Sequence, residues 1–350
     1  MRIGIIGLTL SGKRTFFQLL TGQRAPRQGY SHFEDIKIGK AVIRDPQLES
    51  IADIFRATKI SPAGFEVVLF PSIDCESLAK IDLSRVFESC DLFCHVVRCF
   101  KGEAASGSLM QMNPALDIDQ MFEMMMSLDY KTIQQKKAAL EKPKAFSSGR
   151  PDKVFLTRLN KILQNKEPLV YKSFKPKEDE VIRRLNCITR KPVVLILNTD
   201  DDEPLDKKIL TRIKRKYESQ SVKVLETSLR TEAELSLIED NQRENFLHDL
   251  SIEESAPVRL LRTCFSVLKL KSFLTFHQSE IRVWIEHEGF RVKDVTKIFG
   301  PGSLDGKVKT EVVPLKRVFS SFQGDFPHKL WEMKQQDYRI KDGDIIRVHF

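Results

Sequence analysis

The first 22 residues restrict the fold more than any other part of the chain. Residues 2–8 are rich in Ile and hardly alternate between polar and apolar, which is typical of a strand buried on both faces of a parallel sheet. A turn follows at residues 9–12, and residues 14–21 then carry apolar side chains at helical spacing. A strand, a glycine turn and a helix in this order predict an α/β domain with a doubly wound sheet.

The rest of the chain continues this alternation of strands and helices. Further strands are expected at 38–43, 65–70, 92–97, 192–197 and 222–226. Helical segments are expected at 47–55, 78–89 and 206–218. Strand signals stop between Cys99 and Lys191, where two helical stretches, 116–142 and 152–165, flank a break rich in Pro, Ser and Gly. This arrangement predicts a helical hairpin inserted into the sheet domain.

The C-terminal part of the chain has a different texture. Short β-rich runs occur at 273–275, 281–285, 307–313 and 345–350. One helical segment is expected at 292–299. About 80 residues can fold on their own, so we expect a separate small α+β domain.

Composition narrows the classes of protein that the chain can belong to. The 350 residues include 57 Lys and Arg against 48 Asp and Glu, and the net charge of +9 favours polyanionic partners. No apolar run approaches the roughly 18 residues that a membrane span needs, and no secretion signal is recognised. The cysteines form no CxxC pair and no zinc-type spacing, which indicates a reducing, cytoplasmic environment. Neither a membrane nor DNA is expected as a partner.

Residues 7–13, Gly-Leu-Thr-Leu-Ser-Gly-Lys, match the G-x-x-x-x-G-K part of the phosphate-loop pattern. Gly7 and Gly12 let the backbone turn with its N–H groups facing inward, and the next helix adds positive potential at its N-terminus. Lys13 can then reach the β- and γ-phosphates of a nucleotide. The segment therefore predicts a phosphate-binding loop, and the alternative is a glycine turn that binds nothing.

The residue after Lys13 departs from that pattern. Arg14 stands where Ser or Thr normally coordinates Mg²⁺, and Thr15 follows one place later. A guanidinium cannot ligate a metal because it is permanently cationic and has no lone pair to offer. Arg14 therefore either substitutes for part of the metal's charge or points away, and the need for Mg²⁺ is left open.

Several segments together resemble the YchF family of Obg-like ATPases, phosphate-loop proteins of the TRAFAC class. The resemblance is carried by GLTLSGKRTFFQLLTG at 7–22, RDPQLESIADIF at 44–55, HVVRCF at 95–100, KPVVLILNTDDDE at 191–203, TEAEL at 231–235, SFLTFHQSEIRVWI at 272–285 and YRIKDGDIIRVHF at 338–350. It covers most of the chain in the right order. It implies a phosphate-loop domain at 1–110 and 188–271, an inserted helical or coiled-coil domain at 111–187, and a C-terminal β-grasp TGS domain at 272–350.

The resemblance also implies where a nucleotide base is bound. Asn198 and Asp201 match the family's N-x-x-E, a variant of the guanine-reading N-K-x-D that accompanies a preference for ATP. Aspartate at the fourth position can accept hydrogen bonds from N1 and N2 of guanine, so ATP and GTP both remain candidate ligands. Ser228 and Leu229 occupy the place of the family's short Ser-Ala motif beside the base. The alternative for the acidic residues at 200–203 is a solvated turn.

The positions that the family uses for hydrolysis depart most from its pattern. Its D-x-x-G motif corresponds to Leu-Phe-Pro-Ser at 69–72, its hydrolysis-promoting histidine to Val86, and its first switch threonine to Asp35. Without these groups the metal and the attacking water lose their holders, so we expect weak or absent hydrolysis. A rearranged metal site would use Thr15 and Asp35. His95 is a candidate substitute base, although a structural histidine is the plainer interpretation.

The expected function is therefore that of a purine-nucleotide-binding protein associated with ribosomes or translation. The alternatives are an active ATPase or GTPase with a rearranged metal site, and a nucleotide-independent adaptor that binds ribosomes or RNA. In the C-terminal domain, candidate contacts to phosphates and bases are Lys307, Lys309, Lys316, Arg317, Lys334, Phe319, Phe322 and Trp331. The alternative is that these aromatic side chains belong to the core and the lysines are solvated. The excess positive charge as a whole is expected to be spread over the chain rather than gathered in one patch.

Overall fold

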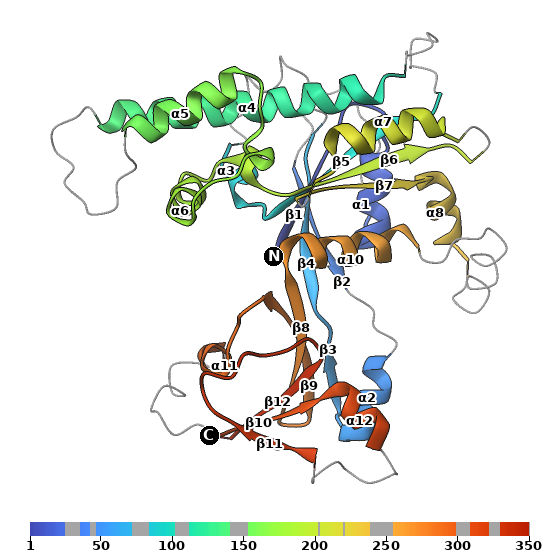
Figure 1. Ribbon diagram of the computed structural model, residues 1–350. Coiled ribbons are helices and arrows are strands. Elements are labelled where there is room, and N and C mark those ends of the chain that lie inside the picture. Colours follow the sequence, from blue (N-terminus) through green and yellow to red (C-terminus); the bar gives the residue numbers. More distant parts are fainter. Residues whose placement is uncertain are drawn as a thin grey trace. The chain divides into compact units, whose positions relative to one another are not determined.

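The protein is described here by a computed structural model (Figure 1). It describes residues 1–24, 36–42, 47–71, 84–101, 112–140, 153–201, 204–219, 221–238, 255–298, 309–321 and 330–349. The chain divides into two compact units, which comprise Met1–Lys40 with Glu66–Val267 and Ala41–Phe65 with Leu268–Phe350. Within the described ranges, no helix combines the length and the apolar character needed to cross a bilayer.

The first unit is built around a six-stranded sheet in the order β2-β4-β1-β5-β6-β7. Its strands are β1 (Arg2–Ile6), β2 (Lys37–Val42), β4 (Gly64–Leu69), β5 (Leu92–Cys99), β6 (Val193–Thr199) and β7 (Val222–Thr227). β4, β1, β5, β6 and β7 are parallel neighbours. β5 and β6 are buried along their whole length, because helices cover both faces of the sheet. The predicted doubly wound α/β sheet is thus confirmed.

Helices lie on both faces of this sheet. Figure 1 shows α4 (Pro114–Leu140) and α7 (Lys207–Tyr217) on one face, and α1 (Lys13–Thr21) and α10 (Ala256–Leu268) on the other. The first unit also contains α3 (Ser84–Ser89), α5 (Lys153–Gln164), α6 (Pro176–Arg184) and α8 (Leu229–Leu235). α5 runs alongside α4, so the two form the expected helical hairpin.

A buried carboxylate ties this hairpin to the sheet. Asp129 of α4 is 1% exposed and accepts hydrogen bonds from the backbone N–H groups of Ile188 (2.6 Å) and Thr189 (2.8 Å). The Thr189 hydroxyl donates a third hydrogen bond to it. Burial raises the pKa of Asp129 to about 6. Ile188 and Thr189 lie a few residues before β6, so the hairpin is anchored near the start of a central strand.

The second unit contains another six-stranded sheet, in the order β11-β10-β12-β8-β9-β3. Its strands are β3 (Lys59–Ser61), β8 (Leu270–His277), β9 (Glu280–His287), β10 (Lys309–Pro314), β11 (Glu332–Lys334) and β12 (Asp344–His349). It also includes α2 (Gln47–Phe55), α11 (Val292–Ile298) and α12 (Leu315–Ser321). Apolar residues of α2, among them Ile51 and Phe55, share a core with Leu274 of β8 and Ile345 of β12. A helix from the N-terminal third of the chain therefore helps to form the core of the C-terminal sheet.

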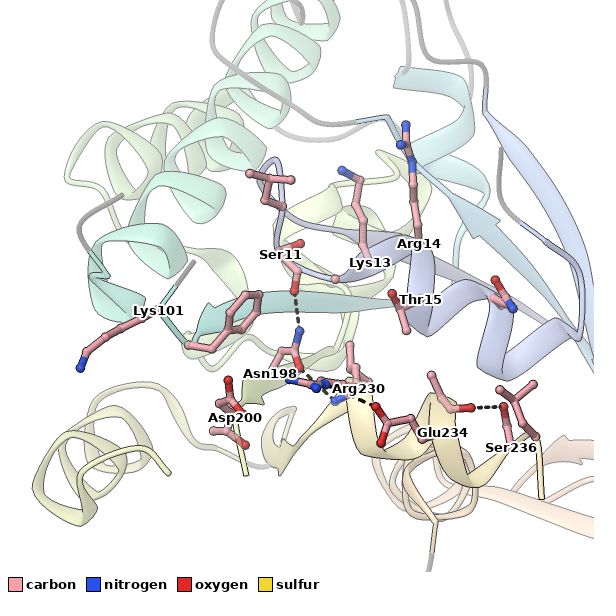
Figure 2. A pocket seen from close by; sticks show the side chains of 18 residues that line it. Ser11, Lys13, Arg14, Thr15, Lys101, Asn198, Asp200, Arg230, Glu234 and Ser236 are labelled. Carbon is pink, nitrogen blue, oxygen red and sulfur yellow. Dashed lines mark hydrogen bonds and ion pairs between the residues drawn. The ribbon is translucent and has the colours of Figure 1, made fainter. Parts of the chain in front are cut away.

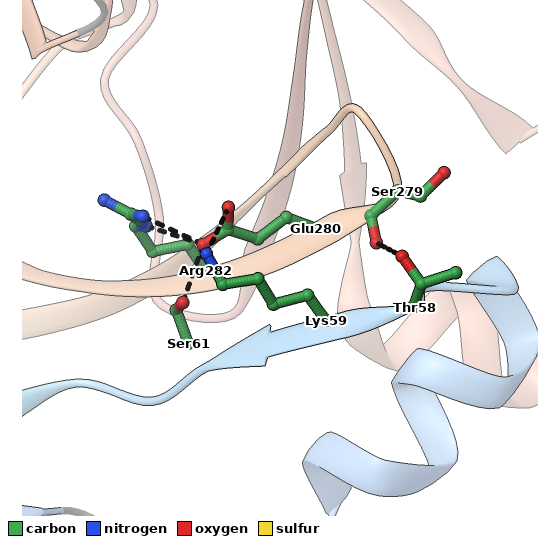
Figure 3. Close-up of polar contacts among 6 residues, drawn as sticks. All are labelled: Thr58, Lys59, Ser61, Ser279, Glu280 and Arg282. Atoms are coloured by element: carbon green, nitrogen blue, oxygen red, sulfur yellow. Dashed lines mark hydrogen bonds and ion pairs between the residues drawn. The ribbon is translucent and has the colours of Figure 1, made fainter.

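Strand β3 also comes from the N-terminal third, and the sequence does not predict it. It pairs in parallel with β9. Figure 3 shows Glu280 of β9 at the centre of the polar contacts between the two strands: it accepts a hydrogen bond from the Ser61 hydroxyl at 2.6 Å and pairs with Lys59 at 3.3 Å and Arg282 at 2.9 Å. The Ser61 hydrogen bond and the adjacent cations lower the pKa of Glu280 to about 2. These contacts stabilise β3 at the edge of the sheet.

Several of the cations and aromatics that the sequence proposes for nucleic-acid contacts have structural partners in this unit. Arg317 and Lys334 both pair with Glu332, at 2.6 and 2.7 Å. Trp331 packs edge-on against Phe55, with ring centroids 5.9 Å apart, within the core of the unit. Lys307 and Phe322 lie outside the described residues.

Candidate functional site

The candidate site lies where several parallel strands end. The carboxyl end of β1 leads into the glycine loop, and that of β5 leads into Phe100 and Lys101. β6 ends with Asn198 and Thr199 and leads into Asp200. β7 leads into Ser228 and α8. Ligands of open α/β sheets bind at this edge, because neighbouring parallel strands deliver their following loops to the same place. A pocket of about 770 Å³ is lined by residues from the loop, from the ends of β5 and β6, and from α8 (Figure 2).

Two close approaches explain the glycines of the loop. Gly12 has a left-handed conformation, with φ of 96°, and a Cβ atom there would lie 2.4 Å from the Asn198 side-chain nitrogen. A Cβ at Gly7 would lie 2.6 Å from the carbonyl oxygen of Val96 on β5. Larger side chains would push the loop away from β5 and β6, so the glycines keep it tight against the sheet.

Asn198 holds the loop and α8 together. Its side-chain nitrogen donates to the carbonyl oxygen of Ser11 at 2.9 Å, and its side-chain oxygen accepts from the backbone N–H of Leu229 at 3.0 Å. The residue is only 6% exposed. Both the nitrogen and the oxygen of the Asn198 side-chain amide are hydrogen-bonded within the protein. Asn198 therefore contributes to the site by fixing the geometry of the pocket wall.

Cationic and polar groups gather where α1 begins. Lys13, Arg14 and Thr15 all line the pocket, with Lys13 buried and the other two half-buried. Figure 2 shows the Lys13 and Arg14 side chains extending from the loop on the same side. The hydroxyl of Ser11 is buried in the pocket wall and has no hydrogen-bond partner among the described residues. Two cations, a helix N-terminus and an unsatisfied hydroxyl form a suitable environment for an anion.

The residues expected to read the base divide into two groups. Asn198 and Leu229 line the pocket, together with Asp200. Asp201 is outside the lining and accepts a hydrogen bond from the hydroxyl of Thr231. Ser228 is also outside it and caps α8 by accepting from the backbone N–H of Thr231 at 3.3 Å.

Several other residues of the lining are not predicted from the sequence. They include Phe100, Lys101, Arg230 and Glu234. For Phe100 there is a signal, because it ends the HVVRCF segment. The sequence contains no such signal for the α8 residues, because only the packing of α8 beside the loop brings them to the pocket.

The described residues at the positions expected to replace the family's hydrolytic groups belong to the core. Leu69 and Phe70 are buried, and the Phe70 ring stacks on Phe87 with centroids 4.2 Å apart. Val86 packs against the same core. None of these residues lines the pocket. Asp35 and Ser72 lie outside the described residues.

His95, the candidate substitute base, is likewise a core residue. It lies within β5, is 1% exposed and is not part of the pocket lining. Burial lowers its pKa to about 3, so the imidazole is neutral near pH 7. Its Nε2 atom has no hydrogen-bond partner in the described part of the chain. This placement supports the structural interpretation.

Among the residues that the structure describes, the pocket does not provide the usual magnesium site of a phosphate loop. Arg14 supplies no lone pair, and Leu69 supplies no carboxylate at the end of β4. Across the described ranges, no group of three or more His, Cys, Asp and Glu side chains is arranged to hold a metal. Thr15 offers one hydroxyl, which is fewer donors than Mg²⁺ requires.

Comparisons with known proteins extend over the whole chain. No family model matches it. The ribosome-binding ATPase YchF of Haemophilus ducreyi is 27% identical, over 100% of this chain and 99% of that protein. The protein of the same name from Bacillus subtilis is 23% identical, over 99% of this chain and 98% of that protein. Obg-like ATPase 1 of Pongo abelii is 24% identical, over 100% of this chain and 92% of that protein.

Two solved structures show the same fold. The YchF GTPase of Schizosaccharomyces pombe has a TM-score of 0.78 at 18% identity, with 100% of this chain and 97% of that chain covered. A GTP binding protein from Pyrococcus horikoshii OT3 has a TM-score of 0.59 at 15% identity, with 100% and 99% covered. Together with the full-length sequence matches, these findings support the resemblance of the whole chain to the YchF family of Obg-like ATPases.

Proposed function

We propose that the protein binds a purine nucleotide, ATP or GTP, in the pocket at the carboxyl edge of the first sheet, and that it associates with ribosomes in the cytoplasm with weak or absent hydrolysis. The observation that carries the proposal is the glycine loop held against β6 by Asn198, with Lys13 and Arg14 at its end. Lys13 and Arg14 bring two cations to one pocket at the N-terminus of α1, which suits a chain of phosphates.

Arg14 offers a reason for a reduced need for Mg²⁺. A guanidinium at the start of α1 places a permanent positive charge in the pocket, where the pattern otherwise has a metal-binding hydroxyl. Its charge would offset part of the phosphate charge. Nucleotide affinity in the micromolar range or weaker is therefore expected to depend only slightly on Mg²⁺.

Weak hydrolysis follows from the positions occupied by Leu69, Phe70 and Val86. Phosphoryl transfer depends on positioned charge and a positioned water, and these apolar side chains pack in the core rather than against the pocket. The second candidate function, an active enzyme with a metal held by Thr15 and Asp35, has no comparable support in the described residues.

Ribosome association is proposed because relatives that match this chain from end to end carry the name ribosome-binding ATPase. The net charge of +9 is compatible with a partner rich in RNA, since cations that meet phosphates release counterions on binding.

Calorimetric titration with ATP, ADP, GTP and GDP, each with and without Mg²⁺, tests the nucleotide proposal. Lys13→Ala is expected to weaken binding at least about tenfold, because one charge-assisted contact to phosphate is worth more than 1.4 kcal/mol. Lys131→Ala, an exposed lysine on α4, is the control and should bind as the parent does. Absence of binding for all four nucleotides would refute the proposal, and binding that vanished without Mg²⁺ would refute the role of Arg14.

Turnover measurements test the second part. We expect less than about 1 turnover per second for ATP and GTP, below the ordinary range of enzymes. Arg14→Ser should not restore hydrolysis, because the other groups at 69–72 and 86 act together with that position. Robust turnover by the parent protein would show that a rearranged site exists.

A further inference from the structure

Helix α7 carries an unusual concentration of positive charge. Its sequence, KKILTRIKRKY, has Lys or Arg at six of its 11 residues and no acidic residue. The helix is capped by Asp206, whose carboxylate accepts from the backbone N–H of Lys208 at 2.8 Å. Six of the chain's 57 Lys and Arg residues are thus gathered on one well-formed helix.

The helix is firmly attached by its other face. Ile213 and Tyr217 are buried in the core of the first unit. The Tyr217 hydroxyl lies 2.9 Å from both the Ala115 carbonyl oxygen and an Asp119 carboxylate oxygen on α4. These contacts fix the rotation of α7 about its axis, so the basic side chains are held toward solvent.

Most of these cations have no acidic partner among the residues that the structure describes. Lys216 pairs with Asp119 at 2.7 Å. The other five are exposed and form no ion pair within the described ranges; they are Lys207, Lys208, Arg212, Lys214 and Arg215. We call these five residues the α7 basic face. Lys208, Arg212 and Arg215 follow the i, i+4, i+7 spacing, which places them on one side of the helix over roughly 10 Å.

We propose that the α7 basic face binds the phosphate backbone of RNA. This inference rests on the ribosome association proposed above, and it assigns that association to a particular surface. A row of unpaired cations at helical spacing matches a polyanion, and the two arginines can each hold a phosphate with two hydrogen bonds. Backbone contacts of this kind position a protein on RNA without reading its sequence.

Two other kinds of partner fit the face less well. Protein interfaces have an apolar, often aromatic centre, whereas the exposed apolar side chain among the α7 residues is Ile209, at 36% exposure. A membrane-binding helix inserts an apolar face into lipid, and the apolar face of α7 is occupied by the protein core.

The α7 basic face is separate from the nucleotide pocket. No residue of α7 lines that pocket. RNA binding through α7 should therefore survive Lys13→Ala, which makes the two activities separable by mutation.

The test compares two triple variants with the same change in charge. One is Lys208→Glu with Arg212→Glu and Arg215→Glu. The matched control is Lys131→Glu with Lys136→Glu and Lys161→Glu, three exposed lysines of the α4–α5 hairpin that form no ion pair within the described residues. Binding is measured to a short fluorescent RNA duplex, to purified ribosomes by sedimentation, and to phosphatidylserine vesicles, with circular dichroism and thermal unfolding to verify folding.

The α7 triple variant is expected to bind RNA and ribosomes at least about tenfold more weakly and to show a logarithmic salt slope that is shallower by about 2 to 3. The hairpin control should lose much less. Equal losses in both variants, or a loss in the control alone, would overturn the assignment to α7. So would α7-dependent binding to vesicles without binding to RNA.

The outcomes also separate this inference from the proposed function. If the parent protein sediments with ribosomes and the α7 variant does so equally well, the inference is wrong and ribosome association stands. If the parent binds the RNA duplex through α7 but does not sediment with ribosomes, the proposed association is wrong and the inference stands. If the parent binds neither, both are wrong.

Discussion

Asn198 donates its side-chain amide to the backbone carbonyl of Ser11 across 187 residues of sequence. The same side chain accepts from Leu229, so one buried residue connects the glycine loop, the end of β6 and the start of α8. The shape of the pocket depends on this contact, because all three segments contribute to its lining.

Replacement of Asn198 by alanine should therefore affect both stability and binding. Asn198→Ala removes two hydrogen bonds and leaves the Ser11 carbonyl and the Leu229 N–H without these partners. We expect the free energy of unfolding to fall by about 2 to 4 kcal/mol and nucleotide affinity to fall about tenfold or more. Urea unfolding and calorimetry measure the two effects. A variant that kept full stability and affinity would show that the loop is held by other contacts.

The two glycines at the ends of α1 offer a matched comparison. Gly12 and Gly22 both have positive φ, 96° and 69°, but a Cβ at Gly12 meets Asn198 whereas one at Gly22 meets nothing within 4 Å. Gly22→Ala should cost only the backbone strain of about 1 kcal/mol and leave binding intact. Gly12→Ala should cost more and weaken nucleotide binding at least about tenfold. Equal effects in thermal unfolding and titration would contradict the close approach to Asn198.

Burial of His95 predicts a pH dependence of stability. Its pKa is about 3 in the folded protein and 6.5 in the unfolded chain, so the unfolded chain binds a proton first as the pH falls below about 6.5. Between pH 7 and pH 5 this should cost about 2 kcal/mol of unfolding free energy. In His95→Leu, which has no titratable group at this position, the unfolding free energy should fall by about 2 kcal/mol less than in the parent over that range. Urea unfolding at the two pH values measures this difference. Equal losses of unfolding free energy in the parent and the variant would show that His95 is not the group responsible.

Glu280 predicts a pH dependence at lower pH. Its folded pKa, about 2, lies below its ordinary value of 4.5, so its contribution is complete above about pH 4.5 and is lost as the pH falls toward 2. Glu280→Gln should lower the unfolding free energy at pH 7 by about 0.5 to 1 kcal/mol, a modest value because the contacts are near solvent. The difference between variant and parent should shrink as the pH falls from 5 to 3.

Glu288→Gln is a suitable control for this experiment. Glu288 belongs to the same unit and pairs with Lys271 at 3.2 Å, and its side chain is largely exposed. Its replacement should change stability by less than about 0.5 kcal/mol. If the two variants behaved alike at both pH values, the Glu280 contacts would not stabilise β3.

Local features of the sequence determined the doubly wound sheet and the glycine loop. The largely apolar, non-alternating sequences of β1, β5 and β6 are typical of strands buried on both faces, and the structure places these strands side by side. The predicted hairpin helices and most strands of the C-terminal unit also correspond to observed elements, because residue periodicity within one element depends only on close neighbours in sequence.

Tertiary structure decided the features that depend on distant residues. A short polar segment such as Lys59–Ser61 becomes a strand only because β9 offers it an edge, and Asp200 rather than Asp201 lines the pocket once Thr231 binds Asp201. Likewise, the basic residues of α7 form an exposed face because Ile213 and Tyr217 bury the opposite side. The sequence by itself determined which segments form strands, helices and a phosphate-type loop, since those preferences are local. Contacts between segments that are far apart in the chain decided which side chains face the pocket, the core or the solvent. These contacts exist only once the segments pack together in the tertiary structure.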